Sequence, residues 1–279
     1  MAFIITDELF MSPDFSALQF LQEQDLKMGT LEFNINDISV VSSSKMLLCN
    51  PARKEVNLVD STAGGVIASV SVPGGPKRIC LLDEEMAAVS LEGRKIQFIK
   101  VEHCSLTLDS VLGVSNDICG ITMSDNKLIT SFTDPPGVQM MSLDGKVMYT
   151  VDNQKAGRNV FKQPYFLTTS MDGFIYVSDW NNHTVTKLDQ RLNVLRIYND
   201  PSLQLPRGII SISRDQLLVC SIHNHSISLL NTRTGNTTVL LGWQDGLKTP
   251  WALSYCPTER KLFVAPLGSS TIIQTYKLV

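Results

Sequence analysis

The chain has 279 residues, of which 43% are hydrophobic and 18% are charged, and its formal net charge is −3 at pH 7. This balance is typical of a folded globular protein and argues against a disordered chain or a generic phosphate-binding protein. No apolar stretch approaches the roughly 20 residues that a membrane helix needs. The opening Met1–Ile5 is too short for a signal peptide and carries no basic residue. We therefore expect a cytoplasmic protein without a membrane partner.

The six cysteines are scattered along the chain and form no C-x-x-C pair. Five of them stand in or beside strand-like apolar runs, where a free thiol behaves as a small hydrophobic side chain. The exception is Cys104. This spacing favours buried free thiols over a zinc site or disulfides.

The first segment of the chain reads differently from the rest. Asp14 is a suitable N-cap, and Gly29 a suitable terminating residue, for a helix over 14–28. Its apolar residues would share one side of the helix. We expect residues 1–29 to form an N-terminal lead that contains this short helix, and residues 30–279 to form the main domain.

Six copies of one pattern run through that domain. Each copy is an apolar run, a polar break of a few residues, and a second, alternating apolar run. The first runs end at Cys49, Val89, Thr130, Val177, Val219 and Val264. These positions are 40 to 47 residues apart, and each second run begins seven or eight residues after its anchor. Four-stranded propeller blades repeat every 40–50 residues or so, whereas a helical solenoid would show helical periodicity.

The fourth copy displays all the strands of such a blade. Its four strand-like runs, separated by turn residues such as Asp172-Gly173, are Gln163–Thr169, Phe174–Val177, Thr184–Asp189 and Asn193–Tyr198. The sequence therefore predicts an all-β fold, a six-bladed β-propeller of four-stranded antiparallel blades.

The two ends of the domain predict how the ring closes. Only seven residues follow Ile272, enough for a third strand of the last blade but not for a fourth. The alternating segment Thr30–Ile35 has no blade of its own. We expect it to pair with Ile272–Leu278, because a closed ring leaves no exposed strand edges.

The fourth and fifth copies carry a more specific pattern. The run Gly173–Val185 contains Ser-Asp-Trp-Asn-Asn-His, and the fifth copy keeps the pair Asn224-His225. These residues resemble the NHL repeat. The resemblance covers 30–279 as architecture and is specific over about 163–231. It implies a six-bladed propeller like the C-terminal domain of tripartite-motif (TRIM-NHL) ubiquitin ligases, in which a RING, B-boxes and a coiled coil precede the propeller.

This chain has no cysteine and histidine framework for zinc, so the resemblance implies no ligase chemistry within it. The chain is then a fragment of a RING-containing ligase, a paralogue that lacks the RING, or an adaptor. These three alternatives stay open at this stage.

His183 and His225 occupy equivalent places in adjacent copies. As a metal or catalytic pair they would lack the third ligand that metal sites need. As structural residues, the Asn-His pairs would shape the tight break between the second and third strands, where Asn tolerates left-handed geometry. We favour the structural interpretation.

A calcium-dependent lactonase-type hydrolase is one alternative function. The oxygen donors in suitable loops are Asn116, Asp117, Asp134, Asp179 and Asn181. Solvated loops are rich in such residues whether or not they bind calcium. No familiar catalytic motif is present, so we expect neither enzyme activity nor a cofactor or metal.

Binding is the better supported function. In a propeller, the loops between second and third strands share one face with the connections between blades. The cations expected on that face outnumber the acids by ten to eight, and aromatic residues are interleaved with them. Arginines beside exposed aromatic residues are typical of protein-binding hot spots, and also of single-stranded RNA sites.

We predict a non-catalytic, TRIM-NHL-like recognition module that binds a protein partner, such as a ubiquitination substrate or an adaptor. RNA binding on the same face is the alternative, since the positive surplus is small for a nucleic-acid site. No DNA partner is expected. The predicted binding residues are Arg53, Lys77, Arg94, Phe132, Trp180, His183, Arg207, His223 and Trp243.

Overall fold

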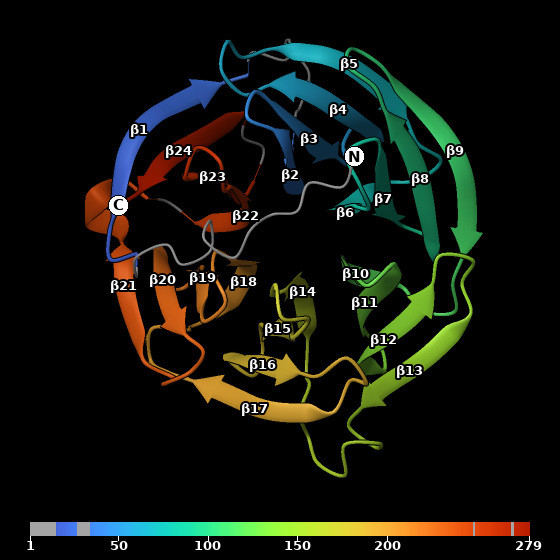
Figure 1. Cartoon of the computed structure of the whole chain (residues 1–279), viewed down its shortest axis with the longest axis vertical. Coiled ribbons are helices and arrows are strands. Elements are labelled where there is room, and N and C mark those ends of the chain that lie inside the picture. Colours follow the sequence, from blue (N-terminus) through green and yellow to red (C-terminus); the bar gives the residue numbers. More distant parts are fainter. Residues whose placement is uncertain (1–14, 27–33, 248, 269–270) are drawn as a thin grey trace.

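Six four-stranded antiparallel sheets form a closed ring around a central channel (Figure 1). The computed structural model describes residues 15–26, 34–247, 249–268 and 271–279. Each sheet is one blade, and the first strand of each blade lines the channel while the fourth lies at the outer rim (Figure 1). The predicted six-bladed β-propeller is confirmed.

The first three blades follow one another in chain order. Blade 1 consists of β2 (Asp37–Ser42), β3 (Lys45–Asn50), β4 (Glu55–Asp60) and β5 (Val66–Ser71). Blade 2 consists of β6 (Pro76–Leu81), β7 (Met86–Leu91), β8 (Lys95–Val101) and β9 (Leu106–Gly113). Blade 3 consists of β10 (Ile118–Ser124), β11 (Lys127–Thr133), β12 (Pro136–Ser142) and β13 (Val147–Asp152).

The last three blades complete the ring, and the sixth takes one strand from the start of the chain. Blade 4 consists of β14 (Pro164–Thr169), β15 (Ile175–Asp179), β16 (Thr184–Leu188) and β17 (Val194–Asn199). Blade 5 consists of β18 (Pro206–Ser211), β19 (Gln216–Ser221), β20 (Ser226–Asn231) and β21 (Thr237–Leu241). Blade 6 consists of β22 (Pro250–Cys256), β23 (Lys261–Pro266), β24 (Ile272–Leu278) and β1 (Leu18–Asp25). A short 3₁₀ helix, η2 (Trp243–Asp245), lies between β21 and β22.

The core lies between neighbouring blades. Every residue of β15 and of β19 is buried, because the second strand of a blade is covered on both of its faces. One apolar cluster links Leu48 of blade 1, Phe263 of blade 6 and Tyr176 of blade 4. The apolar runs that define the repeat are therefore the strands that hold the blades together.

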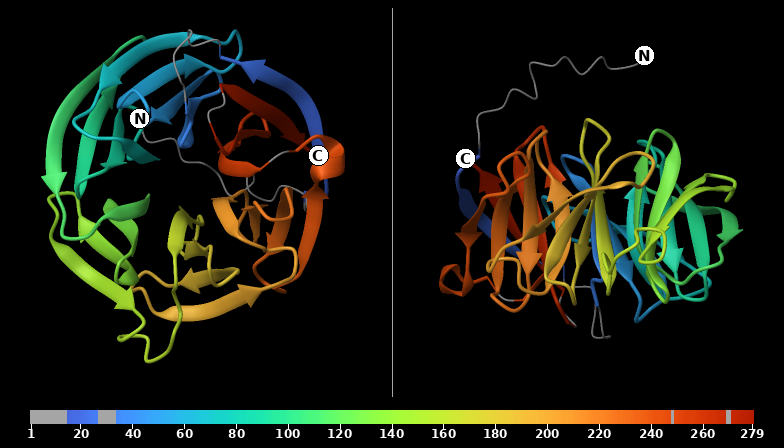
Figure 2. Two further views of the ribbon diagram at one scale, coloured as in Figure 1. Left: turned by 180° about the vertical axis from the view of Figure 1, so that it is seen from behind. Right: turned by 90° about the horizontal axis from the view of Figure 1, so that it is seen from below.

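Two faces of the ring differ in what they carry. The innermost strands begin at one face of the ring, which we call the crossover face. Within the described ranges it holds the connections between blades and the turns between second and third strands, among them 51–54, 92–94, 134–135, 180–183 and 222–225. The opposite face carries the turns between first and second strands, among them 43–44, 82–85 and 257–260. The carboxyl terminus lies at this opposite face (Figure 2, right).

The predicted closure of the ring by an N-terminal strand in the last blade is confirmed, but the strand is β1, so the predicted helix and the predicted closing segment are wrong. Residues 18–25 form a strand instead of part of a helix, and β1 pairs antiparallel with β24 from Leu18 opposite Leu278 to Asp25 opposite Ile272. The predicted closing segment does not take this place. Residues 30–33 of that segment fall outside the described residues, and Asn34 and Ile35 belong to no strand.

The physical reason is the unpaired edge of β24. A third strand without a fourth exposes a row of backbone N–H and C=O groups, and an antiparallel partner satisfies them. Helix propensity is a weaker preference, which tertiary contacts commonly override. Two buried side chains hold the closing strand at its ends: Phe15 is 4% exposed and Leu26 is 2% exposed.

All six cysteines are free thiols. Four are buried, Cys119 is half-buried and Cys104 is exposed, which agrees with the expected use of thiols as small hydrophobic side chains. In the described part of the chain, no helix is long and apolar enough to cross a membrane.

Replacing Phe15 with Ala should lower the free energy of unfolding by about 3 kcal/mol, because the ring packs into the core of blades 5 and 6 and anchors the closing strand. The matched control is Phe20→Ala, since Phe20 in β1 is 53% exposed and makes only an edge contact with Tyr276. That control should cost about 1 kcal/mol or less. Urea unfolding followed by circular dichroism measures both, and equal losses would contradict the assigned closure.

Candidate functional site

Four of the predicted binding residues are exposed on the crossover face, and three of them lie in turns between second and third strands. Arg53 lies in the β3–β4 turn, Arg94 in the β7–β8 turn and His223 in the β19–β20 turn. Arg53 is partly neutralised by Glu55, with 3.5 Å between the charged atoms. The side chains of Arg94 and His223 extend from their turns without being buried.

Trp243 is the most exposed aromatic residue among the predicted set. It begins η2, and 57% of its surface is exposed. Its ring lies 5.1 Å from that of His225, centroid to centroid. The Asp245 carboxylate accepts the N–H of Gly242 at 2.8 Å, which fixes the start of the turn of helix that presents the indole.

Lys77 is not a free cation. Its Nζ lies 2.8 Å from both carboxylate oxygens of Asp117 in the next blade. An exposed ion pair of this kind contributes little to stability. It does cancel much of the positive charge that the sequence analysis assigned to this part of the face.

Phe132 does not belong to the exposed face. Its side chain is 2% exposed at the end of β11, opposite Gly137 of β12. A Cβ at Gly137 would come within 2.9 Å of the Phe132 ring, so the ring covers the glycine and fills the space of a missing side chain. Strand alternation alone did not reveal this orientation.

The two equivalent histidines are structural. His183 Nδ1 accepts the backbone N–H of Leu205 at 3.1 Å, and His225 Nδ1 accepts that of Thr249 at 3.0 Å. Each bond joins a turn of one blade to the residue that precedes the proline at the start of the next blade. Both histidines have left-handed backbone conformations, with φ of 56° and 47°. Lys54 and Arg94 take the same left-handed position before the third strands of blades 1 and 2.

The oxygen donors that suggested calcium do not converge. Asp179 is fully buried, and its carboxylate accepts the backbone N–H groups of Lys162, Gln163 and Asn182 at 2.7 to 3.0 Å. Asp117 is paired with Lys77. Within the described ranges, no group of three or more His, Cys, Asp or Glu side chains is arranged to hold a metal ion.

The centre of the ring holds a channel cavity of about 250 Å³, lined by the innermost strands of all six blades. Asp37 and Arg78 contribute to its wall. Burial raises the pKa of Asp37 to about 6, against the opposing charge of Arg78 and the N–H of Ile79, which Asp37 accepts at 2.9 Å.

Two buried arginines stand with a group of aromatic rings where the innermost strands begin. Arg78 and Arg207 are each 2% exposed. The Arg207 guanidinium carbon lies 3.4 Å from the centroid of Trp180, 4.1 Å from that of Tyr165 and 4.5 Å from that of Trp251. Burial lowers the pKa of Arg207 to about 10, so the group is still a cation at neutral pH.

Arg78 approaches the same rings from the neighbouring side. Its guanidinium carbon lies 3.9 Å from the centroid of Phe166 and 5.1 Å from that of Tyr165. We define the channel mouth as this cluster: Asp37, Arg78, Tyr165, Phe166, Trp180, Arg207 and Trp251. Of these, only Trp180 and Arg207 were predicted as binding residues.

A sequence signal for the others was present. Four of the innermost strands begin with a proline, and Tyr165, Arg207 and Trp251 each follow directly after one of these prolines. In a closed ring, equivalent positions of the innermost strands converge on the axis. The alignment of the repeats therefore indicates that these residues lie close to the axis. It does not indicate which of their side chains point toward one another.

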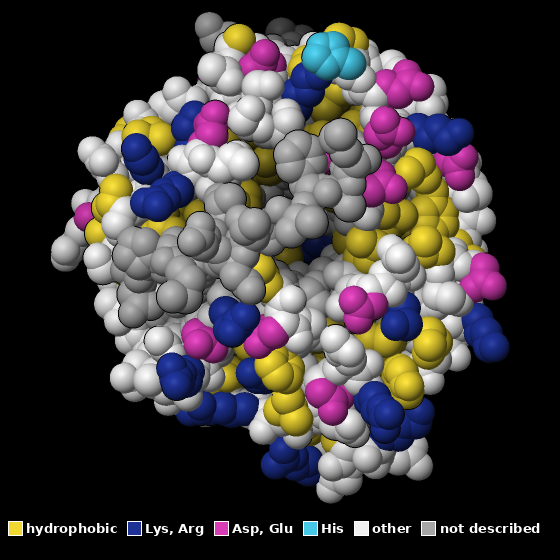
Figure 3. All heavy atoms as spheres, viewed as in Figure 1, with side chains coloured by type: hydrophobic (Ala, Val, Ile, Leu, Met, Phe, Trp, Pro, Cys, Tyr) yellow, Lys and Arg dark blue, Asp and Glu magenta, His cyan; other side chains and the backbone are white. Residues whose placement is uncertain are grey.

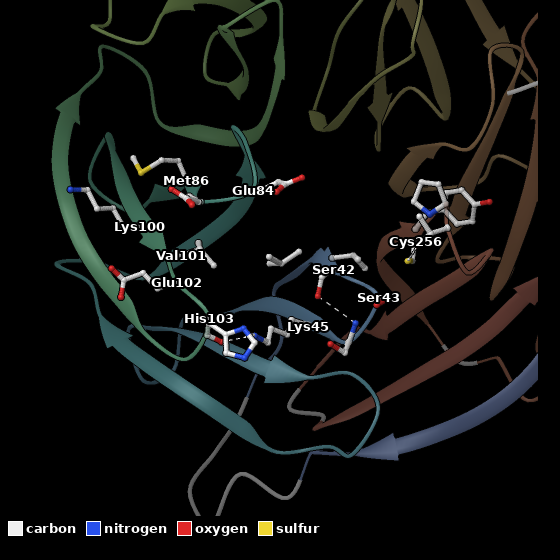
Figure 4. A pocket seen from close by; sticks show the side chains of 17 residues that line it. Ser42, Ser43, Lys45, Glu84, Met86, Lys100, Val101, Glu102, His103 and Cys256 are labelled. Atoms are coloured by element: carbon white, nitrogen blue, oxygen red, sulfur yellow. Dashed lines mark hydrogen bonds between the residues drawn. The ribbon is translucent and has the colours of Figure 1, made fainter. Parts of the chain in front are cut away.

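The opposite face has a larger pocket of about 1070 Å³, which no sequence feature indicated. Blades 1, 2 and 6 form its walls, and Lys45 points toward His103 across a 2.9 Å contact between Nζ and Nδ1 (Figure 4). Figure 3 looks onto this face and shows positive and negative side chains interspersed over it, without a patch of one sign.

No family model and no curated protein matches this chain. Solved structures do resemble it. Virginiamycin B lyase from Staphylococcus aureus is 14% identical with a TM-score of 0.66, over 94% of this chain and 100% of that one. The WD40 propeller domain of Doa1 is 12% identical with a TM-score of 0.62, over 94% and 98%. A protein of unknown function from Bacteroides thetaiotaomicron is 13% identical with a TM-score of 0.71, over 94% and 73%.

At these identities the likeness shows the propeller fold alone. It does not confirm the NHL repeat or the relation to TRIM-NHL proteins. The similar structures include an enzyme and a WD40 domain, so the fold does not decide between catalysis and recognition.

Replacing His183 or His225 with Ala should lower the free energy of unfolding by about 1–3 kcal/mol, because each change leaves a backbone N–H without its acceptor. The control is His223→Ala, at an exposed position, with an expected change within about 0.5 kcal/mol. Thermal melts with and without a chelator separate this role from metal binding. A melting temperature that falls on chelation in the wild type, but not in the variants, would contradict it.

The buried carboxyl of Asp37 should make stability depend on pH. Because its pKa is raised to about 6 from 3.8, the folded protein retains a proton that the unfolded chain releases. The free energy of unfolding should therefore fall as pH rises from about 4 to about 6, by up to about 3 kcal/mol from this group. Asp37→Asn should remove that component in urea titrations across this range. An unchanged pH slope in the variant would refute the assignment.

Proposed function

We propose that this protein is a non-catalytic recognition module that binds a protein partner, in the manner of a TRIM-NHL propeller that selects a substrate or an adaptor. The binding surface is the exposed part of the crossover face that carries Arg94, His223 and Trp243, which we call the rim. The observation that carries the proposal is Trp243, a rigid aromatic side chain that is 57% exposed on a face of connecting loops. Tryptophan and arginine are the residues most enriched among binding hot spots.

The charged residues of the same rim support this proposal. Arg94 is exposed on a turn with a left-handed backbone conformation, with φ of 60°. His223 is exposed in the blade that precedes Trp243. Fixed loops on a rigid ring bind with a smaller loss of conformational entropy than mobile loops would.

RNA is the second candidate and has less support. A single-stranded RNA site needs exposed aromatic platforms beside free cations. Here Lys77 is paired with Asp117, and Arg78 and Arg207 are buried among rings. Phe132 is in the core. Three of the cations expected on this face are therefore unavailable to phosphates, and Phe132 is unavailable to stacked bases.

The hydrolase alternative depends on a calcium site that the geometry does not favour. Asp179 uses its carboxylate on backbone N–H groups, and Asn116 donates to Gln139 at 3.3 Å. Both groups thus have structural partners. Recognition requires only the exposed side chains that the rim presents.

The double variant Trp243→Ala with Arg94→Ala should reduce partner capture from cell extract by about 30-fold or more, the loss expected when hot-spot residues are truncated. Captured protein is quantified by mass spectrometry after crosslinking to the immobilised chain. The double variant should keep the wild-type melting temperature, because both side chains are exposed.

The matched control is Tyr149→Ala with Arg191→Ala, which removes an exposed aromatic residue and an exposed arginine away from the crossover face. It should capture the partner as well as the wild type does. Equal capture by both double variants would refute the rim as the binding surface. Capture that is lost after ribonuclease treatment and falls steeply with salt would favour RNA.

A further inference from the structure

The unpaired polar atoms of the channel mouth are all hydrogen-bond donors. Among the described residues, no acceptor is bonded to five buried N–H-bearing nitrogens, which are Arg78 Nε and Nη2, Arg207 Nε and Nη1, and Trp180 Nε1. Buried donors without acceptors are costly, and native structures rarely leave several of them together. What this cluster lacks is therefore an acceptor.

The charges at the mouth are also unbalanced. Arg78 donates from Nη1 to the backbone oxygens of Asn36 and Lys77, which are neutral acceptors. Neither Arg78 nor Arg207 forms an ion pair within the described ranges. The buried carboxyl nearby is Asp37, which accepts the N–H of Ile79 and titrates near pH 6. Two buried cations thus face at most one negative charge.

Aromatic rings pack closely around both guanidinium groups. Trp180, Tyr165 and Trp251 surround Arg207, and Phe166 covers Arg78, with ring centroids 3.4 to 4.5 Å from the guanidinium carbons. Contact at these distances favours the cation but supplies no hydrogen-bond acceptor to the unbonded N–H groups along the edge of each guanidinium. Such an edge presents parallel N–H donors that match the two oxygens of a carboxylate.

The channel cavity next to the mouth has room for a small molecule. Its volume is about 250 Å³, and Thr168 and Ser254 lie on its wall. The Thr168 hydroxyl oxygen accepts the N–H of Ser211, and the Ser254 oxygen accepts that of Val40. Their hydroxyl hydrogens are then free to donate, so the wall offers further donors to an acceptor.

We propose that the channel mouth binds a carboxylate, which Arg78 and Arg207 clamp through their N–H edges while Trp180 Nε1 donates to the same group. The carboxylate belongs either to a small free acid or to the carboxyl terminus of a partner chain. The chemistry of recognition is the same for both sources. This site is distinct from the exposed rim, and its binding is measured without any protein partner.

The test uses the full chain and three free acids, acetate, succinate and citrate, titrated by calorimetry at constant ionic strength. At least one acid should bind saturably, with a stoichiometry of one, whereas succinamide, which has no charge, should not. Sulfate and inorganic phosphate are titrated in parallel. Intrinsic fluorescence gives a second readout in a Trp243→Phe background, where the only indoles left are Trp180 and Trp251.

Three variants locate the binding. Arg207→Met keeps the volume and the contact with the rings but removes the donors, and should weaken binding at least tenfold. Trp180→Phe removes one donor and should weaken binding severalfold, which keeps the test valid if Arg207→Met does not fold. The control is Arg196→Met. The Arg196 guanidinium carbon also lies over a ring, 4.8 Å from the centroid of Tyr198, but Arg196 is exposed on the outermost strand β17. Its Nη1 and Nη2 donate to backbone oxygens.

A peptide arm identifies the source of the carboxylate. A mixture of short peptides with free carboxyl termini is compared with the same mixture amidated. Binding of the free-terminus peptides in preference to the free acids assigns the site to a partner's terminus, and the reverse assigns it to a small acid. The proposal is overturned if no acid and no peptide binds at 10 mM, or if sulfate or phosphate binds and no carboxylate does. It is also overturned if Arg207→Met and Trp180→Phe both bind the carboxylate as tightly as the wild type does. Loss of partner capture on the rim has no bearing on these outcomes.

Discussion

The pairing of β1 with β24 is the interaction on which the rest of this molecule depends. Each blade buries its second strand against its neighbours, so a blade at the end of an open row would leave one side of its core in water. The eight-residue strand Leu18–Asp25 removes that end by completing the sixth sheet. Phe15 packs into the core of blades 5 and 6 at one end of this strand, and Leu26 packs into a second apolar cluster at the other end.

Closure also explains why charged groups are buried near the axis. The six innermost strands line the channel and begin at one face, so their first side chains converge on the axis. Arg78 and Arg207 come from blades 2 and 5, yet both contact Tyr165 of blade 4. An arginine among aromatic rings keeps favourable contacts for its flat face, but its N–H groups still need acceptors. The arrangement thus combines a rigid wall with unused donors.

The crossover face divides its residues between structure and recognition. The residue just before the third strand takes a left-handed conformation in several blades. In blades 4 and 5 it is a histidine whose ring bonds to the next blade, whereas in blade 2 it is Arg94, whose side chain is exposed. The same backbone position therefore links neighbouring blades in blades 4 and 5 and carries an exposed positive charge in blade 2.

The sequence by itself determined the number of blades and the repeating strand pattern, because these follow from local periodicity and from residues close together in the chain. It favoured a structural role for His183 and His225 but also predicted His183 as a binding residue, and their bonds to the next blade came from the structure. It did not determine the closing strand, since Leu18–Asp25 has a composition compatible with a helix and only the free edge of β24, some 250 residues away, makes it a strand. It placed Phe132 and Arg207 on an exposed face, and tertiary packing buried both. The same packing gathered Arg78, Tyr165, Trp180 and Trp251 around Arg207, because convergence on the axis depends on all six blades at once.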